Sequence, residues 1–282
     1  MKVDSLLLNS VAPSTRRVYD RAMVSYLEFC EQYSIEDKYS SHTIELFVAH
    51  LANKGIKPNS IRSTLSGIRH HCNINSIKFE HNTPRIAMML RGVGRSAETS
   101  TRSKNALRIR HLQKMCNATV HLFENKIATM LRSLFTLSFF AMLRPSEMLY
   151  TSTSPQHQLQ QSAVRLKQDK VKLTFSSYKH SDGPVTINIG RQDCGVCPVR
   201  MLTDYLSQFQ GDANDPLYPH SVGEVGNWMQ QCLAFSGVKT VLTLHSFRRG
   251  GATWYSEHGF PNAKLAALGR WKSNAYLKYV KP

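Results

Sequence analysis

The C-terminal part of the chain concentrates side chains that can bind and attack a phosphate group. A guanidinium offers two parallel N–H donors to phosphate oxygens. An imidazole and an indole N–H add further donors, and a phenol oxygen is a nucleophile for phosphorus. Within thirty-five residues the chain carries His245, Arg248, Trp271, Tyr276 and Tyr279. Their types and order predict a site for phosphate chemistry.

An earlier arginine, Arg144, lies in the sequence Leu-Arg-Pro-Ser-Glu-Met-Leu. Proline disfavours helical backbone at the residue before it, so Arg144 is expected at an exposed turn, with Ser146 capping a short helix. A positive group at such a helix junction can point into a cleft. Taken alone, however, Arg144 is better explained by a surface ion pair with Glu147.

The β structure is expected in the middle of the chain. Residues 163–167, 170–178 and 184–189 alternate apolar and polar side chains, which predicts a small antiparallel sheet. Lys179 falls at the tip of the predicted hairpin, from which it could enter or leave a site. The alternative for Lys179 is an ordinary solvated turn lysine.

The N-terminal third is predicted to be entirely helical. Apolar residues recur at helical spacing in four segments, with Ser14 and Ser41 as expected N-caps of the first two. The third segment, 59–74, places Arg62 and Arg69 on the face opposite its apolar one. Basic outer faces on four short helices are consistent with a module that clamps DNA. An ordinary helical bundle with solvated charges is the alternative.

A polar, basic stretch at residues 94–105 lacks large apolar side chains and is predicted to be a linker. The expected division is therefore a helical domain at 1–93, the linker at 94–105 and a second domain at 106–282. Helices are expected in the second domain near 108–118, 125–142, 199–206 and 223–235. The whole chain is thus predicted to be mainly α with a small antiparallel β-sheet.

Charge indicates the class of partner. The chain has 36 Lys and Arg against 19 Asp and Glu, for a net charge of +17 spread over its length. Such an excess favours a polyanion, and double-stranded DNA is the expected partner, although solubility alone is the alternative. No stretch approaches the length of a membrane span. Cys194 and Cys197 form one C-x-x-C, a weak zinc signal because structural zinc needs four ligands.

Six scattered cysteines and the lack of a signal peptide indicate a reducing compartment. The protein is therefore expected to be intracellular, in the nucleus of a eukaryote or otherwise in the cytoplasm.

The motifs resemble those of the tyrosine recombinases, the phage-integrase family of site-specific DNA recombinases. The first family arginine lies in an L-R-x-S-E-L motif, similar to the sequence around Arg144. The family lysine lies in a β-hairpin, which corresponds to Lys179. The H-x-x-R motif matches His245 and Arg248, and a G-x-W motif matches Trp271. The family nucleophile follows by about eight or nine residues, which selects Tyr279, eight residues after Trp271, over Tyr276.

The resemblance implies a helical, SAM-like core-binding domain followed by an α+β catalytic domain. It also implies roles. Arg144 and Arg248 would bind the nonbridging oxygens, with hydrogen bonds from His245 and Trp271, and Tyr279 would form a 3′-phosphotyrosyl intermediate. Glu147 would support an active-site arginine or histidine, and Tyr276 is the competing nucleophile.

The family chemistry needs no cofactor or metal, and the bond energy is stored in the phosphotyrosine. By the same resemblance Lys179 would protonate the leaving 5′ oxygen, and a homotetramer would assemble on two DNA sites. Only three residues follow Tyr279, where many members have a further helix that contacts a neighbouring protomer. Either the usual tetramer contact is not expected, or the sequence is truncated. The resemblance suggests an origin in a mobile element. The alternatives are a catalytically inactive DNA-binding relic and a relaxing topoisomerase.

Overall fold

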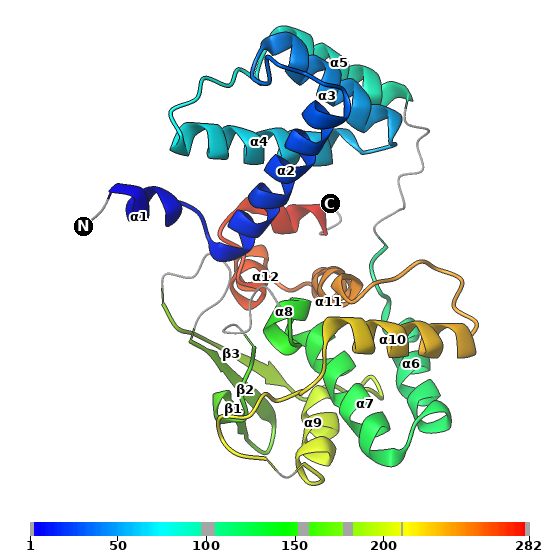
Figure 1. Cartoon of the computed structure of the whole chain (residues 1–282). Helices are drawn as coiled ribbons and strands as arrows, with labels where there is room; N and C mark the ends of the chain where they lie inside the picture. The colour runs from blue at the N-terminus through cyan, green and yellow to red at the C-terminus, as the bar shows by residue number, and fades with distance from the viewer. Residues whose placement is uncertain (1–2, 97–104, 152–157, 177–182, 210, 280–282) are drawn as a thin grey trace. The chain divides into compact units, whose positions relative to one another are not determined.

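The computed structural model describes residues 3–96, 105–151, 158–176, 183–209 and 211–279. The chain divides into two compact units, Met1–Thr101 and Arg102–Pro282. Each is held by its own apolar core. The fold is mainly α with one small antiparallel sheet, which lies in the second unit (Figure 1), as the sequence predicted.

The first unit consists of helices. They are α1 (Val3–Leu8), α2 (Pro13–Gln32), α3 (Ser41–Asn53), α4 (Pro58–Ile74) and α5 (Pro84–Ser96). The inward face predicted for α4 is confirmed, because its apolar residues at helical spacing, from Ile61 to Cys72, are buried. The close packing of α2 on α4 depends on Gly67, where an added Cβ would lie 3.0 Å from Tyr19 Cα.

Three predictions for this unit are wrong in detail. Helix α2 is capped by Ala12 and not by Ser14, because Pro13 takes the first helical position, where its fixed φ fits and its missing N–H is not needed. Helix α3 is capped by Ser40 and not by Ser41, with the Ser40 hydroxyl accepting from the Thr43 N–H at 3.2 Å.

The third correction concerns the predicted linker at 94–105. Helix α5 continues through its first three residues to Ser96. Val93 still packs against the core of the unit, so the apolar contact that supports the helix reaches the residue directly before the predicted linker. Residues 97–104 lie outside the described part of the chain.

The second unit is built around α7 (Asn125–Phe140), most of whose side chains are buried. Helices α6 (Ile109–Leu122), α9 (Pro198–Leu206) and α11 (His245–Glu257) pack on it, and α10 (Val222–Phe235) packs on α6. The remaining elements are α8 (Pro145–Met148), α12 (Asn262–Gly269) and the 3₁₀ turns η2 (Gln161–Ala163) and η3 (Asn274–Lys278).

The sheet of the second unit has the order β1 (Val164–Leu166), β2 (Lys170–Phe175), β3 (Val185–Gly190), all antiparallel. The alternation in β2 buries Val171, Leu173 and Phe175 on one face. Val171 pairs with Ile189, and Leu173 pairs with Ile187. The inward face of β2 thus joins the apolar core cluster of the unit. The Phe175 ring on this face lies against the guanidinium of Arg270.

Two adjacent glycines let α11 lie against its neighbours. An added Cβ at Gly250 would lie 2.0 Å from the carbonyl oxygen of Leu107, and one at Gly251 would lie 2.0 Å from that of Phe139. Neither distance can accommodate a carbon atom. The pair therefore brings the backbone of α11 directly onto α7 and the segment before α6, which fixes the helix that carries Arg248.

Candidate active site

The turn after α7 presents Arg144. Helix α7 ends at Phe140, Met142 adopts a left-handed φ of 47°, and Pro145 starts α8. The Glu147 carboxylate accepts a hydrogen bond from the Arg144 backbone N–H at 2.8 Å and another from its Nη1 at 2.7 Å. The predicted cap, Ser146, is wrong: Arg144 is the N-cap residue, and the Glu147 side chain satisfies its N–H.

Glu147 also binds a second arginine. Arg270 follows α12 in a left-handed conformation (φ 56°, ψ 44°), and its Nη2 donates to Glu147 Oε2 at 2.7 Å. The side chain of Arg270 is 0% exposed and that of Glu147 is 2% exposed, whereas that of Arg144 is 20% exposed. The guanidinium of Arg270 also lies over the Phe175 ring, 4.7 Å from its centroid. The pairing of Arg144 with Glu147 is therefore not an isolated surface ion pair.

Arg248 is the third arginine of the site and, like Arg270, it is buried, with 2% of its surface exposed. Its Nη1 donates to the carbonyl oxygen of Met142, and its Nη2 donates to that of Gly269. The indole of Trp271 covers the guanidinium, with the ring centroid 4.1 Å from Cζ. Arg248 thus ties the turn after α7 to the end of α12.

These groups form one electrostatic cluster. Burial raises the pKa of Glu147, but Arg270, Arg144 and Arg248 outweigh burial, so the pKa lies below its usual value and the carboxylate is charged at neutral pH. Burial and then the charge of Arg144 lower the pKa of Arg248 to about 9, against the opposing effects of Glu147 and Tyr279. At neutral pH, three guanidinium groups (+3) and one carboxylate (−1) leave a charge of +2.

The two candidate nucleophiles lie around Trp271. Its ring centroid is 5.9 Å from that of Tyr279 and 6.1 Å from that of Tyr276. The backbone of Tyr279 is held by the Thr253 hydroxyl, which donates to its carbonyl oxygen at 3.0 Å. Among the described residues, Tyr279 is the phenol that acts on the pKa of Arg248. Together with the packing of the Tyr279 ring near Trp271, this charge effect indicates that Tyr279 lies close to the arginine cluster.

His245 is the first residue of α11 and is partly buried, one helical turn before Arg248. The fixed spacing along the helix puts both side chains on adjoining parts of the same face. Lys179, the predicted general acid, lies outside the described residues. Of the predicted site residues, the structure brings Arg144, Arg248, Trp271 and Tyr279 together.

Arg270 is the member of the cluster that no sequence motif identified. It lies between Gly269 and Trp271. Its signal was a charged side chain directly after the glycine that ends an apolar helix. Such a position commonly takes a left-handed residue, which turns the side chain away from the helix direction.

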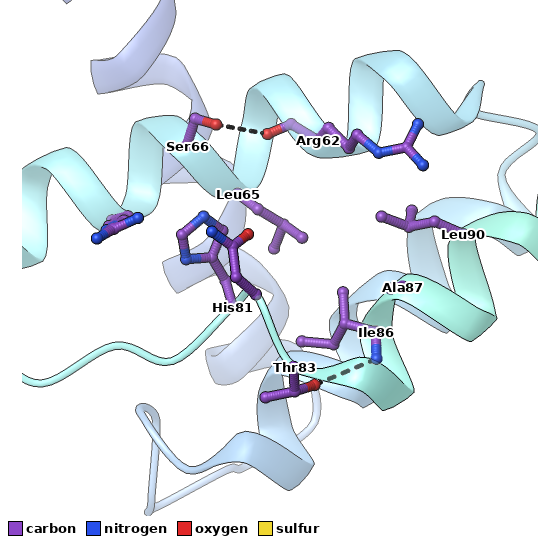
Figure 2. A pocket seen from close by; sticks show the side chains of 10 residues that line it. Arg62, Leu65, Ser66, His81, Thr83, Ile86, Ala87 and Leu90 are labelled. Carbon is purple, nitrogen blue, oxygen red and sulfur yellow. Dashed lines mark hydrogen bonds between the residues drawn. The ribbon is translucent and has the colours of Figure 1, made fainter.

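A separate groove of about 530 Å³ lies in the first unit between α4 and α5. Figure 2 shows its apolar side chains Leu65, Ile86 and Leu90, with Arg62 beside them. Two hydroxyls near the groove already serve the helices: Ser66 donates to the Arg62 carbonyl oxygen at 2.9 Å, and Thr83 accepts from the Ile86 N–H at 3.2 Å. This groove shares no residue with the arginine cluster.

The six cysteines, including Cys194 and Cys197, are free thiols. In the described part of the chain, no three His, Cys, Asp or Glu side chains are grouped so as to hold a metal ion. Over the same residues, no helix combines the length and apolar character that crossing a membrane requires.

No protein-family model matches the chain, and no curated protein matches it. Solved structures do. A Tn1549 transposon integrase in complex with transposon right end DNA has a TM-score of 0.64 at 11% identity, with 100% of this chain and 95% of that chain covered. The XerH site-specific recombinase bound to palindromic difH substrate, a post-cleavage complex, has a TM-score of 0.62 at 15% identity, with 90% and 73% covered.

A lambda integrase dimer bound to a COC′ core site has a TM-score of 0.59 at 18% identity, with 92% of this chain and 87% of that chain covered. At these identities the likeness concerns the fold. The match to the Tn1549 integrase covers the whole chain and therefore both units. The chain has the fold of the tyrosine-type site-specific recombinases and integrases.

Proposed function

We propose that the protein is a site-specific DNA recombinase or integrase of the tyrosine recombinase family, which cleaves and rejoins DNA strands through a 3′-phosphotyrosyl intermediate. The observation that carries the proposal is the cluster of Arg144, Arg248, Trp271 and Tyr279 at a centre of charge +2. Attack on a phosphodiester builds negative charge on its nonbridging oxygens, and fixed positive donors lower that barrier.

Each of these groups has one role in strand cleavage. The Tyr279 phenol oxygen forms a bond to phosphorus while the bond from phosphorus to the 5′ oxygen breaks. The phenol proton passes to His245, and the leaving 5′ oxygen takes a proton from Lys179. Arg144 and Arg248 bind the nonbridging oxygens, with the Trp271 N–H as a further donor.

Rejoining reverses the same chemistry. A 5′-hydroxyl from another DNA strand attacks the phosphotyrosine and releases the Tyr279 phenol, so the number of phosphodiester bonds is conserved. Repetition on the second pair of strands completes recombination. We propose double-stranded DNA as the partner and a homotetramer on two DNA sites as the working assembly. The net charge of +17 and the DNA-bound state of the similar structures support DNA as the partner.

The decisive experiment traps the covalent intermediate. The full chain is incubated with a pool of duplexes that carry randomised flanks and a nick near the randomised site, so that a short 5′ fragment is lost after cleavage. We expect a protein–DNA adduct that survives denaturant. Proteolysis and mass spectrometry of the adduct should identify Tyr279 as the modified residue.

The matched variants are Tyr279→Phe and Tyr276→Phe, each of which removes one oxygen. Tyr279→Phe should abolish the adduct and leave duplex binding unchanged, while Tyr276→Phe should retain the adduct. An adduct that persists in Tyr279→Phe and is lost in Tyr276→Phe would transfer the nucleophile to Tyr276. DNA binding without any adduct would favour the inactive relic. Joining of strands from two different duplexes distinguishes a recombinase from a relaxing topoisomerase.

A further inference from the structure

The buried cluster contains an arginine that DNA does not reach. Arg144 is partly exposed, whereas the side chain of Arg270 is 0% exposed. A phosphate of the substrate can therefore meet Arg144 but not Arg270 while this packing holds. Of the groups that Arg270 binds, Glu147 is the one that also binds Arg144.

Glu147 links the two arginines through different oxygens. Its Oε1 accepts from Arg144 Nη1 at 2.7 Å, and its Oε2 accepts from Arg270 Nη2 at 2.7 Å. Oε2 also accepts from the Arg144 backbone N–H at 2.8 Å. The orientation of the carboxylate, and hence of the Arg144 side chain, is thus set from the side of Arg270.

Arg270 is itself held by backbone groups. Its Nη1 donates to the Leu268 carbonyl oxygen at 3.0 Å and lies 3.4 Å from that of Ala141. Its Nη2 lies 3.5 Å from the Met142 carbonyl oxygen, which also accepts from Arg248. A planar guanidinium presents its donors in a fixed arrangement that serves several such acceptors at once, and the compact ammonium of a lysine does not reproduce that arrangement.

We propose that Arg270 is a positioning residue of the strand-transfer site: it clamps the Glu147 carboxylate, and Glu147 in turn fixes the Arg144 guanidinium where the scissile phosphate binds. This inference rests on the proposed function. It adds a residue that is buried away from the substrate and acts through its ion pair with Glu147.

The charges around Glu147 make the clamp testable by pH. In the described part of the chain it faces Arg144 from the start of α8, Arg248 from α11 and Arg270 from the end of α12. The sheet contributes the uncharged ring of Phe175 behind Arg270. Without Arg270, a buried carboxylate keeps the burial that disfavours its charge and loses the cation that opposes burial most strongly.

The experiment compares Arg270→Met, Arg270→Lys, Glu147→Gln and the double variant Arg270→Met/Glu147→Gln in the full chain. Duplex binding and adduct formation on the trapping substrate are measured between about pH 5 and 8, a range that lies above the usual pKa of a free glutamate. We expect Arg270→Met to bind DNA normally, to form adduct roughly 10–100-fold more slowly, as a displaced catalytic group does, and to lose further activity as the pH falls.

The double variant tests whether the pH effect of Arg270→Met comes from the protonation of Glu147. Glutamine does not titrate, so Arg270→Met/Glu147→Gln should lack the extra loss at low pH that Arg270→Met shows, while remaining slow at neutral pH. Arg270→Lys keeps the positive charge but loses the planar guanidinium, so it should show a smaller pH effect than Arg270→Met. A uniform loss of activity without a pH effect, or wild-type kinetics in Arg270→Met, would overturn the proposal.

A second readout does not need DNA cleavage. Carbon NMR of protein labelled at the glutamate carboxyls follows the titration of Glu147 directly, and Glu147→Gln identifies its signal. The wild type is compared with Arg270→Lys, so the test can still be made if Arg270→Met does not fold. The midpoint should rise in the variant, and an unchanged midpoint would contradict the clamp. If the midpoint rises but the wild type forms no adduct, the proposed function fails while the ion-pair clamp stands.

Discussion

The two units hold their positive charge in opposite ways. In the second unit, Arg248 and Arg270 are buried and are fixed by backbone carbonyls, aromatic rings and Glu147. In the first unit, Arg62 and Arg69 are exposed on α4, and the Arg85 side chain is 78% exposed even though it pairs with Glu45. Buried charge depends on exact geometry, whereas exposed charge is screened by salt and easily replaced.

The largest effect is expected for a substitution of the buried Arg248. We expect Arg248→Ala to reduce adduct formation by at least about 10²–10³-fold, because one fixed donor to the developing charge is lost. It should also destabilise the second unit, since two backbone carbonyls lose their donor. The neighbouring Arg249→Ala is the control, and it should retain adduct formation. Equal losses in the two variants would show that charge, and not geometry, is what this part of α11 supplies.

A purely steric test uses the glycines of the two units. Gly250→Ala should destabilise the second unit by about 3 kcal/mol or more, because the new Cβ has 2.0 Å to the Leu107 oxygen. Gly67→Ala, with 3.0 Å to Tyr19 Cα, should cost the first unit roughly 1–2 kcal/mol. The control, Gly226→Ala, faces open space in α10 and should stabilise by about 0.5–1 kcal/mol.

Denaturant unfolding separates the effects on the two units. All three tryptophans, Trp228, Trp254 and Trp271, lie in the second unit, so their fluorescence reports on that unit alone. Far-ultraviolet circular dichroism follows both. A loss for Gly67→Ala as large as that for Gly250→Ala would remove the predicted difference in tightness between the units.

Acid should act on the buried cluster through Glu147. Its folded-state pKa lies below the usual 4.5, so its charge contributes stability that is fully present above about pH 4.5 and is lost as the pH falls through the folded-state value. Glu147→Gln should therefore be less stable than the wild type at pH 7, and the difference should shrink below pH 4.5. The measurement is tryptophan fluorescence during urea unfolding at a series of pH values. A difference that is constant with pH would exclude the ionised carboxylate as its source.

The sequence alone predicts the elements whose side chains repeat regularly. The period of α4 and the alternation in β2 identify both the elements and their buried faces. Helix starts are harder to predict, because Pro13 takes the first helical position and moves the cap to Ala12, and because Ser40 and Ser41 are both suitable caps. The extension of α5 to Ser96 depends on Val93 packing against the core, a tertiary contact that composition does not reveal.

The candidate site shows the same division. Residue types and spacing single out His245 and Arg248 for phosphate chemistry, whereas Tyr279 is chosen over Tyr276 only by resemblance to the recombinase family. Their catalytic roles remain predictions. The position of Arg270 depends on a left-handed backbone at the end of α12 and on a carboxylate more than a hundred residues earlier. No local pattern encodes such a meeting, so only the folded chain reveals it.

The smallest effect is expected for the exposed arginines of the first unit. Arg62 lies on the basic face of α4, and if that face contacts DNA phosphates, Arg62→Ala should reduce the slope of log binding constant against log salt by about 1. Arg85→Ala is the control: its guanidinium is bound to both oxygens of Glu45, at 2.7 and 3.0 Å, so it should change the slope less. Binding of duplex DNA is measured at several salt concentrations. If neither variant changes the slope, the charge of the first unit does not face the duplex, and the arginine cluster of the second unit must supply the phosphate contacts without it.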